Sequence, residues 1–276
     1  MDFLSTILKQ KRQRVETAKL SVSTEVLQLM ARKTRDIAVP HALVAALRDK
    51  SKINIIAEFK RKSPSRGEIR RHADPVMIAQ AYEAAGAAAV SVLTEEDYFD
   101  GSLDDLRAVR QAISLPLVRK DFIFEEYQLY ESATTGADAL LLIVAALDDE
   151  TLARLRRITE DELGMDALVE VHTSEEMGRA VNSGAKLIGV NNRNLGTFEV
   201  SLETSAQLAA IAGDKVLLIS ESGIESVDDI RRLYDLGYRG FLIGESLMRA
   251  DDPGAALRKF TQRRQGAKEE CLEFKL

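Results

Sequence analysis

The sequence predicts an α/β fold, a single closed (β/α)8 barrel, and two observations predict it. Short apolar, β-branched runs alternate with amphipathic helical patterns over most of the 276 residues. One join, in which a helix ends, a glycine follows and a strand begins, recurs four times. Near-continuous apolar strands separated by helices are typical of a parallel sheet that helices cover on its outer face.

Eight short runs, apolar and rich in β-branched residues, are the strand candidates. They lie at 53–59, 88–93, 116–120, 138–144, 166–171, 186–191, 215–220 and 239–244. The four clearest helical patterns lie at 74–86, 125–136, 174–184 and 227–237. Each of the four ends in a glycine just before a strand, which suits the left-handed backbone of a helix C′ position.

Four copies of one αβ join within eight strands indicate a closed ring, the TIM barrel, rather than an open doubly wound sheet. The open sheet is the alternative, and it is disfavoured because no G-x-G-x-x-G motif follows the first strand. We expect an N-terminal helical extension over 1–50, with its helices capping one end of the barrel, and a barrel catalytic domain over 51–260. We expect a charged C-terminal tail over 261–276, and for both flanking segments we favour a role in packing or solubility.

Composition narrows the class of protein. A hydrophobic fraction of 45% is ample for a core, and a net charge of −6 with both signs interspersed argues against nucleic acid or an anionic membrane as a partner. A lone cysteine, Cys271, fits a reducing cytoplasm. No apolar run is long enough to span a bilayer, and the first residues do not resemble a signal peptide. Because the three histidines show no metal-ligand spacing, we expect no metal site. For the oligomeric state we expect a monomer or weak homodimer.

Charged and polar residues gather at the carboxyl ends of the predicted strands, where the active site of such a barrel lies. The amino ends show no such enrichment. For one residue a solvated strand end or a salt bridge is an equally good explanation, but for the whole set it is not. The set is Glu58, Lys60, Thr94, Glu95, Glu96, Arg119, Lys120, Asp121, Glu170, Asn191, Asn192, Arg193, Glu221, Ser222, Glu245 and Ser246.

Strand periodicity and chemistry pick out pairs within this set. Glu58 and Lys60 are two residues apart, so they share one face of the first strand. Lys120 and Glu170 follow different strands and form a candidate acid and base. That role requires burial and neighbours to lower the pKa of the lysine and to raise the pKa of the carboxylate.

The loops after the seventh and eighth strands predict a phosphate site, which is their usual role in this fold. Backbone N–H groups of glycines can approach a phosphate closely. The candidates are Gly223, Gly244, Glu245 and Ser246, with Ser63 reaching over from the first loop. The alternative is that the glycines serve only tight turns.

The first βα loop, 61–67, has the polar, Gly-ended composition of a mobile lid and contains Pro64. Two aromatic residues near strand ends, Phe99 and Phe122, are candidates for the wall of a pocket that takes a flat apolar group. Phe59, between Glu58 and Lys60 on the first strand, is expected to pack outward against a helix.

With these residues in view, the sequence closely resembles the indole-3-glycerol phosphate synthase family of tryptophan biosynthesis. The motifs that carry the resemblance run in order from residue 56 to residue 248, and they are IAEFKRKSPSRG, VSVLTEEDYFDGS, PLVRKDFI, ALVEVH, IGVNNRNL, ISESGI and FLIGESLM. The resemblance implies a reaction in which 1-(2-carboxyphenylamino)-1-deoxyribulose 5-phosphate closes its ring and loses carbon dioxide and water. It implies no cofactor, and since the chain ends near the barrel's end we expect no fused isomerase domain.

The resemblance also implies roles for individual residues. Lys120 matches the family's general acid, and Glu170 matches its base in the dehydration. Lys60 is suited to hold the substrate carboxylate until it leaves. Glu58 and Asn191 match residues that orient the substrate and the lysines. The polar rim is completed by Arg193, Glu221 and Ser222.

Two other functions stay open on the sequence. A Schiff-base aldolase would use Lys120 or Lys60 as its nucleophile. A scaffold would bind a phosphate in the barrel without catalysis.

Overall fold

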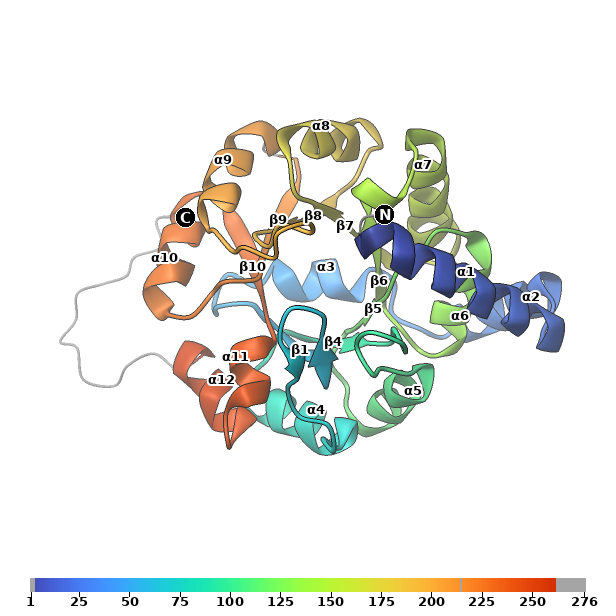
Figure 1. Ribbon diagram of the computed structural model, residues 1–276, viewed down its shortest axis with the longest axis horizontal. Helices are drawn as coiled ribbons and strands as arrows, with labels where there is room; N and C mark the ends of the chain where they lie inside the picture. The colour runs from blue at the N-terminus through green and yellow to red at the C-terminus, as the bar shows by residue number, and fades with distance from the viewer. Residues whose placement is uncertain (1–2, 214, 262–276) are drawn as a thin grey trace.

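Eight parallel strands close into a barrel in the computed structural model, which describes residues 3–213 and 215–261 (Figure 1). The strands follow chain order around the ring, and the last pairs with the first. They are β1 (Ile55–Phe59), β4 (Ala89–Leu93), β5 (Leu117–Lys120), β6 (Ala139–Ile143), β7 (Asp166–Val171), β8 (Leu187–Asn191), β9 (Leu217–Glu221) and β10 (Tyr238–Ile243). The predicted (β/α)8 fold is therefore confirmed. Both ends of each predicted strand lie within two residues of the ends of an observed strand.

Helices cover the outside of the ring. They are α4 (Pro75–Ala84), α5 (Leu103–Ala112), α6 (Glu126–Thr134), α7 (Asp149–Arg157), α8 (Ser174–Asn182), α9 (Glu203–Ala212), α10 (Val227–Asp235), α11 (Glu245–Arg249) and α12 (Pro253–Thr261). Two short segments adjoin them, a 3₁₀ turn η1 (Val144–Ala146) and a π-helical turn η2 (Ile158–Glu162). Side-chain caps begin five of the helices, each contributing about 1 kcal/mol, and the cap residues are Asp74, Ser102, Asp148, Thr173 and Ser226.

The repeated αβ joins adopt the predicted backbone. Their glycines have φ angles of 85°, 84°, 83° and 102° at Gly86, Gly136, Gly184 and Gly237. Side chains with a Cβ rarely adopt these angles, so glycine at the join ends each helix and turns the chain into the next strand.

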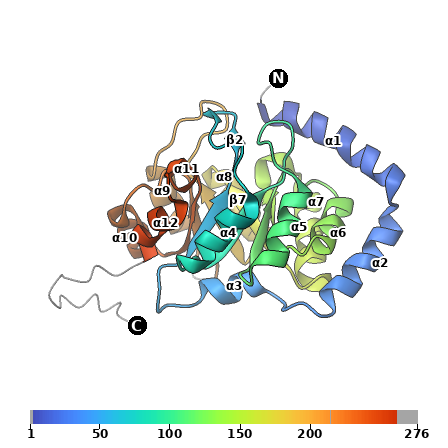
Figure 2. The ribbon, with the colours of Figure 1, turned by 90° about the horizontal axis from the view of Figure 1, so that it is seen from below.

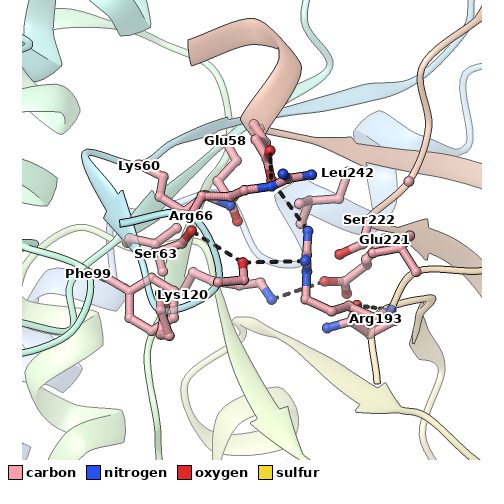
Figure 3. A pocket seen from close by; sticks show the side chains of 18 of the residues that line it. Glu58, Lys60, Ser63, Arg66, Phe99, Lys120, Arg193, Glu221, Ser222 and Leu242 are labelled. Carbon is pink, nitrogen blue, oxygen red and sulfur yellow. Dashed lines mark hydrogen bonds and ion pairs between the residues drawn. The ribbon is translucent and has the colours of Figure 1, made fainter. Parts of the chain in front are cut away.

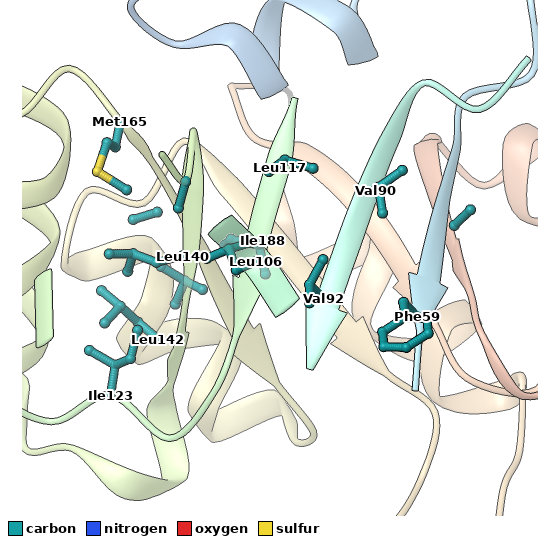
Figure 4. Close-up of a cluster of buried hydrophobic side chains, with 14 of the residues drawn as sticks. Phe59, Val90, Val92, Leu106, Leu117, Ile123, Leu140, Leu142, Met165 and Ile188 are labelled. Atoms are coloured by element: carbon teal, nitrogen blue, oxygen red, sulfur yellow. The ribbon is translucent and has the colours of Figure 1, made fainter. Parts of the chain in front are cut away.

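Alternating strand residues build two cores. Leu141 points into the barrel with Ile56, whereas Leu140 and Leu142 point outward against the helices (Figure 4). Phe59 belongs to the outer core, as predicted, and the Arg61 guanidinium lies 4.8 Å from its ring centroid. The inner core fills the barrel, so the space for a ligand lies at its carboxyl mouth.

The N-terminal helices lie at both ends of the barrel, which corrects the expectation that they cap one. Helix α1 (Phe3–Ser21) lies beside the carboxyl mouth, α2 (Thr24–Arg35) descends against α6, and α3 (Ala42–Leu47) closes the opposite end (Figure 2). Leu43 and Leu47 of α3 are buried in the inner core. The amphipathic pattern indicated helices, but a local pattern does not encode the end at which each one packs.

Two strands begin with buried carboxylates. Asp166 accepts hydrogen bonds from the Val44 backbone and from His41, each at 3.0 Å. Asp138 pairs with Arg110 at 3.0 Å. These two charges do not amount to the enrichment seen at the carboxyl ends, and they hold the connecting segments together rather than lining a cavity.

Helix α12 ends at Thr261, whose hydroxyl donates to the Ala85 carbonyl at 2.7 Å. The predicted charged tail and Cys271 lie outside the described residues. Within residues 3–213 and 215–261, no helix combines the length and apolar character needed to cross a membrane.

Candidate active site

A cavity of about 520 Å³ opens at the carboxyl ends of the strands. Every residue to which the sequence assigned a catalytic or binding role contributes to its wall, and Figure 3 shows part of this set. These residues are Glu58, Lys60, Ser63, Pro64, Phe99, Lys120, Phe122, Glu170, Asn191, Arg193, Glu221, Ser222, Gly223, Gly244, Glu245 and Ser246. They come from seven strand ends and the first loop, so closure of the ring is what brings them together.

Four charged side chains form one layer at the floor of the cavity. Glu58, Lys120, Glu170 and Glu221 come from β1, β5, β7 and β9, which are alternate strands of the ring. Alternate strands of such barrels supply side chains to the same layer. Lys120 Nζ lies 2.8 Å from Glu170 Oε2 and 3.0 Å from Glu221 Oε2, so one cation bridges two carboxylates.

Burial and pairing shift the pKa values within this layer. Burial opposes the charged form of Lys120, but Glu170 and Glu221 outweigh it and raise the lysine pKa above its usual value. Burial likewise opposes ionisation of Glu170, yet the Lys120 ammonium lowers its pKa to about 2. Burial is the largest effect on Glu221 and raises its pKa to about 7. The expected directions for Lys120 and Glu170 are therefore wrong, because ion pairing outweighs burial at both groups, and the raised carboxylate is Glu221.

The second lysine is paired within its own strand. Lys60 Nζ lies 2.5 Å from Glu58 Oε1, and both side chains face the cavity, as their spacing predicts. Glu58 occupies the space that Gly244 leaves free, because a Cβ at Gly244 would lie 2.4 Å from Glu58 Oε1. This glycine makes room for a carboxylate of the charged layer.

The side chain of Glu245 is held by three arginines at one rim of the cavity. Arg66 lies 3.0 Å from one of its oxygens, Arg193 lies 3.3 Å from the other, and Arg249 lies 3.7 Å from the first. Sequence reasoning named Arg193 but missed Arg66 and Arg249. Arg66 lies in the first loop, whose polar composition was the available signal that it faces the cavity.

Aromatic side chains also line the cavity. The rings of Phe99 and Phe122 lie 6.3 Å apart at 41°. Phe3 lies edge-on to Tyr98 at 5.2 Å and to Phe198 at 5.7 Å, and Phe3, Leu4, Leu195 and Phe198 also line the cavity. Sequence reasoning missed these residues, because it assigned the N-terminal helix to packing and passed over the segment after β8.

The predicted lid loop is folded over the cavity as a hairpin. Strands β2 (Lys62–Ser63) and β3 (Gly67–Glu68) pair antiparallel, and Pro64 lies at the turn. Arg193 donates to the hydroxyl of Ser65 at 3.3 Å, which links the hairpin to the loop after β8. That the hairpin opens and closes stays a prediction.

Several residues grouped with the mouth do not line the cavity. Arg119 points outward between the strands and α6, where it donates to Asp121 at 2.9 Å and to Ser132 at 3.1 Å. Asn192 donates to the Ser220 hydroxyl at 3.0 Å, behind the sheet. The reason is strand alternation, since Arg119 precedes the inward Lys120 and Asn192 follows the inward Asn191.

Three neighbouring acidic residues, Glu95, Glu96 and Asp97, lie close enough together to offer ligands to a metal ion. Each already has a partner. Glu95 accepts backbone N–H groups of the loop, Glu96 pairs with Lys11 at 2.6 Å, and Asp97 pairs with Arg14 at 2.6 Å. These contacts fix the loop after β4 and helix α1.

Comparison with known proteins identifies the family. The family model described as indole-3-glycerol phosphate synthase matches residues 4–260. The chain is 47% identical over 259 residues to the indole-3-glycerol phosphate synthase of Carboxydothermus hydrogenoformans, covering 92% of this chain and 98% of that protein. It is 48% identical over 244 residues to that of Mycolicibacterium gilvum, covering 88% and 89%.

Solved structures show the same fold at low sequence identity. Thiamine phosphate pyrophosphorylase from Pyrococcus furiosus superposes with a TM-score of 0.57 at 16% identity, covering 75% of this chain and 93% of that one. A 3-hexulose-6-phosphate synthase gives a TM-score of 0.55 at 16% identity, covering 75% and 97%. The fold is thus shared with other barrels, whereas the sequence match over nearly the whole chain identifies one family. The chain belongs to the indole-3-glycerol phosphate synthase family.

Proposed function

We propose that the charged layer converts 1-(2-carboxyphenylamino)-1-deoxyribulose 5-phosphate into indole-3-glycerol phosphate, carbon dioxide and water. The observation that carries this is the position of Lys120, between Glu170 and Glu221 at 2.8 and 3.0 Å. An ammonium held charged by two carboxylates can donate a proton, and the ionised carboxylate beside it can accept one. Ring closure and dehydration need both.

Lys120 acts as the general acid in this proposal. Attack of the aryl carbon on the ribulose carbonyl leaves negative charge on the carbonyl oxygen, and a proton from the ammonium neutralises it. The raised pKa keeps the lysine protonated until that charge develops. Glu221 has a pKa of about 7, so its gain or loss of a proton changes the net charge of the layer near neutral pH.

Glu170 acts as the base in the dehydration. Its lowered pKa keeps it ionised, and a hydrogen bond from the Asn191 side chain contributes to that lowering. The side-chain oxygen Oδ1 of Asn191 accepts the Arg193 backbone N–H at 3.1 Å, which orients the side-chain amide. Asn191 therefore positions Glu170, in agreement with the role that the family resemblance implies.

The substrate has three recognisable ends, and the cavity offers a matching group for each. Lys60 faces the cavity and holds the substrate carboxylate before decarboxylation, while Glu58 orients Lys60. Phe99 and Phe122 take the aryl ring. The phosphate lies at the opposite rim, against backbone and hydroxyl groups of Ser63, Ser222, Gly223, Gly244 and Ser246, with Arg193 and the backbone of Glu245 nearby.

A Schiff-base aldolase is disfavoured by the electrostatics of Lys120. A lysine nucleophile must be neutral, whereas two carboxylates raise the pKa of this one. Borohydride added with substrate therefore leaves no adduct on Lys120 under our proposal.

The finer assignments of context are also proposals. We propose a cytoplasmic enzyme that acts as a monomer or weak homodimer on a small anionic substrate, with no nucleic acid or membrane partner. The net charge of −6 supports the absence of a nucleic acid or anionic membrane partner. We propose the division into an extension over 1–50, a catalytic barrel over 51–260 and a tail over 261–276.

The direct test of the function is to add the anilino-deoxyribulose phosphate and follow indole fluorescence. Growth of indole emission supports the proposal. A protein that binds the substrate without producing indole, and whose Lys120→Ala variant binds equally well, is instead the scaffold.

A further inference from the structure

His172 connects the catalytic layer to the protein surface. It follows β7 directly, and its side chain is 9% exposed. Its Nδ1 lies 3.2 Å from Glu176 Oε2, and its Nε2 lies 3.4 Å from Glu170 Oε1. Nε2 is buried and has no hydrogen-bond partner within strict geometry among the described residues. Nε2 therefore faces Oε1 of the proposed base, Glu170.

The two oxygens of Glu170 face different partners. Oε2 accepts from Lys120 at 2.8 Å, and Oε1 faces His172. Glu176 also accepts the His172 backbone N–H at 2.8 Å, which holds the main chain of His172 against α8. A continuous series of groups therefore runs from Glu176 through His172 and Glu170 to Lys120. Glu176 is its more exposed end, since its side chain is 16% exposed against 3% for Glu170.

The reaction requires protons from solvent. One proton converts the carbonyl oxygen into a hydroxyl, and a second lets that hydroxyl leave as water. The base recovers one proton from the ring as the double bond forms. The substrate loses a carboxylate as neutral carbon dioxide, so each turnover consumes one proton net, and a buried acid must be recharged from outside.

We propose that His172 is a positioning residue that relays protons between solvent and Glu170. The inference rests on the role proposed for Glu170. The Nε2–H bond of the imidazolium breaks as an O–H bond to Glu170 Oε1 forms, which leaves a neutral imidazole that keeps its proton on Nδ1. The ring then turns toward solvent, where the bare Nε2 takes up a new proton, and turns back to face Glu170. The carboxyl group of Glu170 then turns and passes its proton to the neutral amine of Lys120.

The surroundings keep His172 able to donate. Burial acts to lower its pKa, but the hydrogen bond to Glu176 and the charges of Glu170 and Glu221 outweigh burial and raise the pKa. These carboxylates come from α8, β7 and β9, and the facing cation is Lys120 of β5, on the far side of Glu170. The imidazolium is therefore populated at neutral pH.

The test is His172→Gln, which keeps an amide near the Nε2 position but cannot relay a proton. We expect kcat to fall about tenfold, which is less than for loss of a direct general acid or base, while KM stays within about twofold. The kcat of the unsubstituted enzyme decreases as pH rises through the pKa of His172, and this decrease is absent from the variant. The matched control is His41→Gln, since His41 also pairs with a buried carboxylate, Asp166, but at the opposite end of the barrel. It leaves kcat and its pH profile unchanged.

A kcat and pH profile like those of the unsubstituted enzyme overturn the relay, as does a loss that is uniform across pH or confined to KM. If His172→Gln does not fold, Glu176→Gln decides, because loss of its charge moves the same decrease to lower pH, and an unmoved decrease overturns the proposal. Near-normal turnover by Glu170→Gln would instead refute the proposed base. An inactive Glu170→Gln beside a fully active His172→Gln refutes the relay alone.

Discussion

Lys120 Nζ and Glu170 Oε2 lie 2.8 Å apart although 50 residues separate them in the chain. The separation is bridged because β5 and β7 are alternate strands of one ring, and both side chains point into it. The same geometry sets Glu221 on the other side of the lysine at 3.0 Å. The closed barrel therefore brings the reacting groups together, and burial and pairing inside it set their pKa values.

Glu221→Gln tests the electrostatics of the layer. The pKa of Glu221 is raised from its usual value of 4.5 to about 7, so between these pH values the folded state holds a proton that the unfolded state has lost. Its contribution to stability is present below pH 4.5 and is lost as pH rises through 7. Relative to the variant, the native protein should lose about 1.4 kcal/mol of unfolding free energy per pH unit in this window.

Urea unfolding at a series of pH values measures that slope. Equal slopes for the native protein and Glu221→Gln between pH 4.5 and 7 would show that Glu221 is not protonated in the folded state, contrary to the account.

Lys11→Met tests how α1 is attached beside the mouth. Lys11 is 3% exposed and pairs with Asp121 at 2.8 Å and with Glu96 at 2.6 Å. Breaking a buried ion pair leaves a desolvated carboxylate, so we expect a loss of about 3 kcal/mol of unfolding free energy.

Arg14→Ala is the matched control on the same helix. Arg14 pairs with Asp97, but its side chain is 46% exposed, so its removal should cost less than about 1 kcal/mol. Chemical denaturation compares the two variants. Equal losses would mean that Lys11 is no more than another surface contact.

Gly244→Ala tests the packing of Glu58 in the charged layer. The added Cβ would lie 2.4 Å from Glu58 Oε1, so the carboxylate and its partner Lys60 must move. A displacement of this kind should lower kcat/KM on the order of ten- to hundredfold. Steady-state kinetics provide the measurement.

Gly178→Ala is the control for that substitution. Gly178 lies in α8, and a Cβ there meets nothing within 4 Å, so the change should stabilise the protein by about 0.5–1 kcal/mol and leave kcat/KM unchanged. If Gly244→Ala matches the control in activity, then Glu58 has no fixed position in the site.

Local patterns made most of the barrel predictable. Apolar β-branched runs located the strands, and Gly86 and its three counterparts marked each helix end through their positive φ. Because the carboxyl ends of parallel strands meet at one end of a barrel, Glu58, Lys120, Glu170 and Glu221 could be placed together from their positions in the chain.

The features that the sequence analysis did not predict depend mostly on contacts between residues far apart in the chain. Nothing near Phe3 in the sequence indicates that it meets Tyr98 and Phe198 at the mouth. His172 lies two residues after Glu170, so the spacing that paired Glu58 with Lys60 was an available signal that the sequence analysis did not use. The pKa directions in the layer could not be read either, since ion pairing outweighs burial at Lys120 and Glu170 but not at Glu221.

The central claim is that Lys120 and Glu170 exchange protons with the substrate. The most direct measurement is steady-state production of indole fluorescence from the anilino-deoxyribulose phosphate by Lys120→Ala and by Glu170→Gln. The account predicts that each variant loses turnover on the order of a hundredfold or more while remaining folded. Turnover within a few-fold of the unsubstituted enzyme for both variants would contradict it.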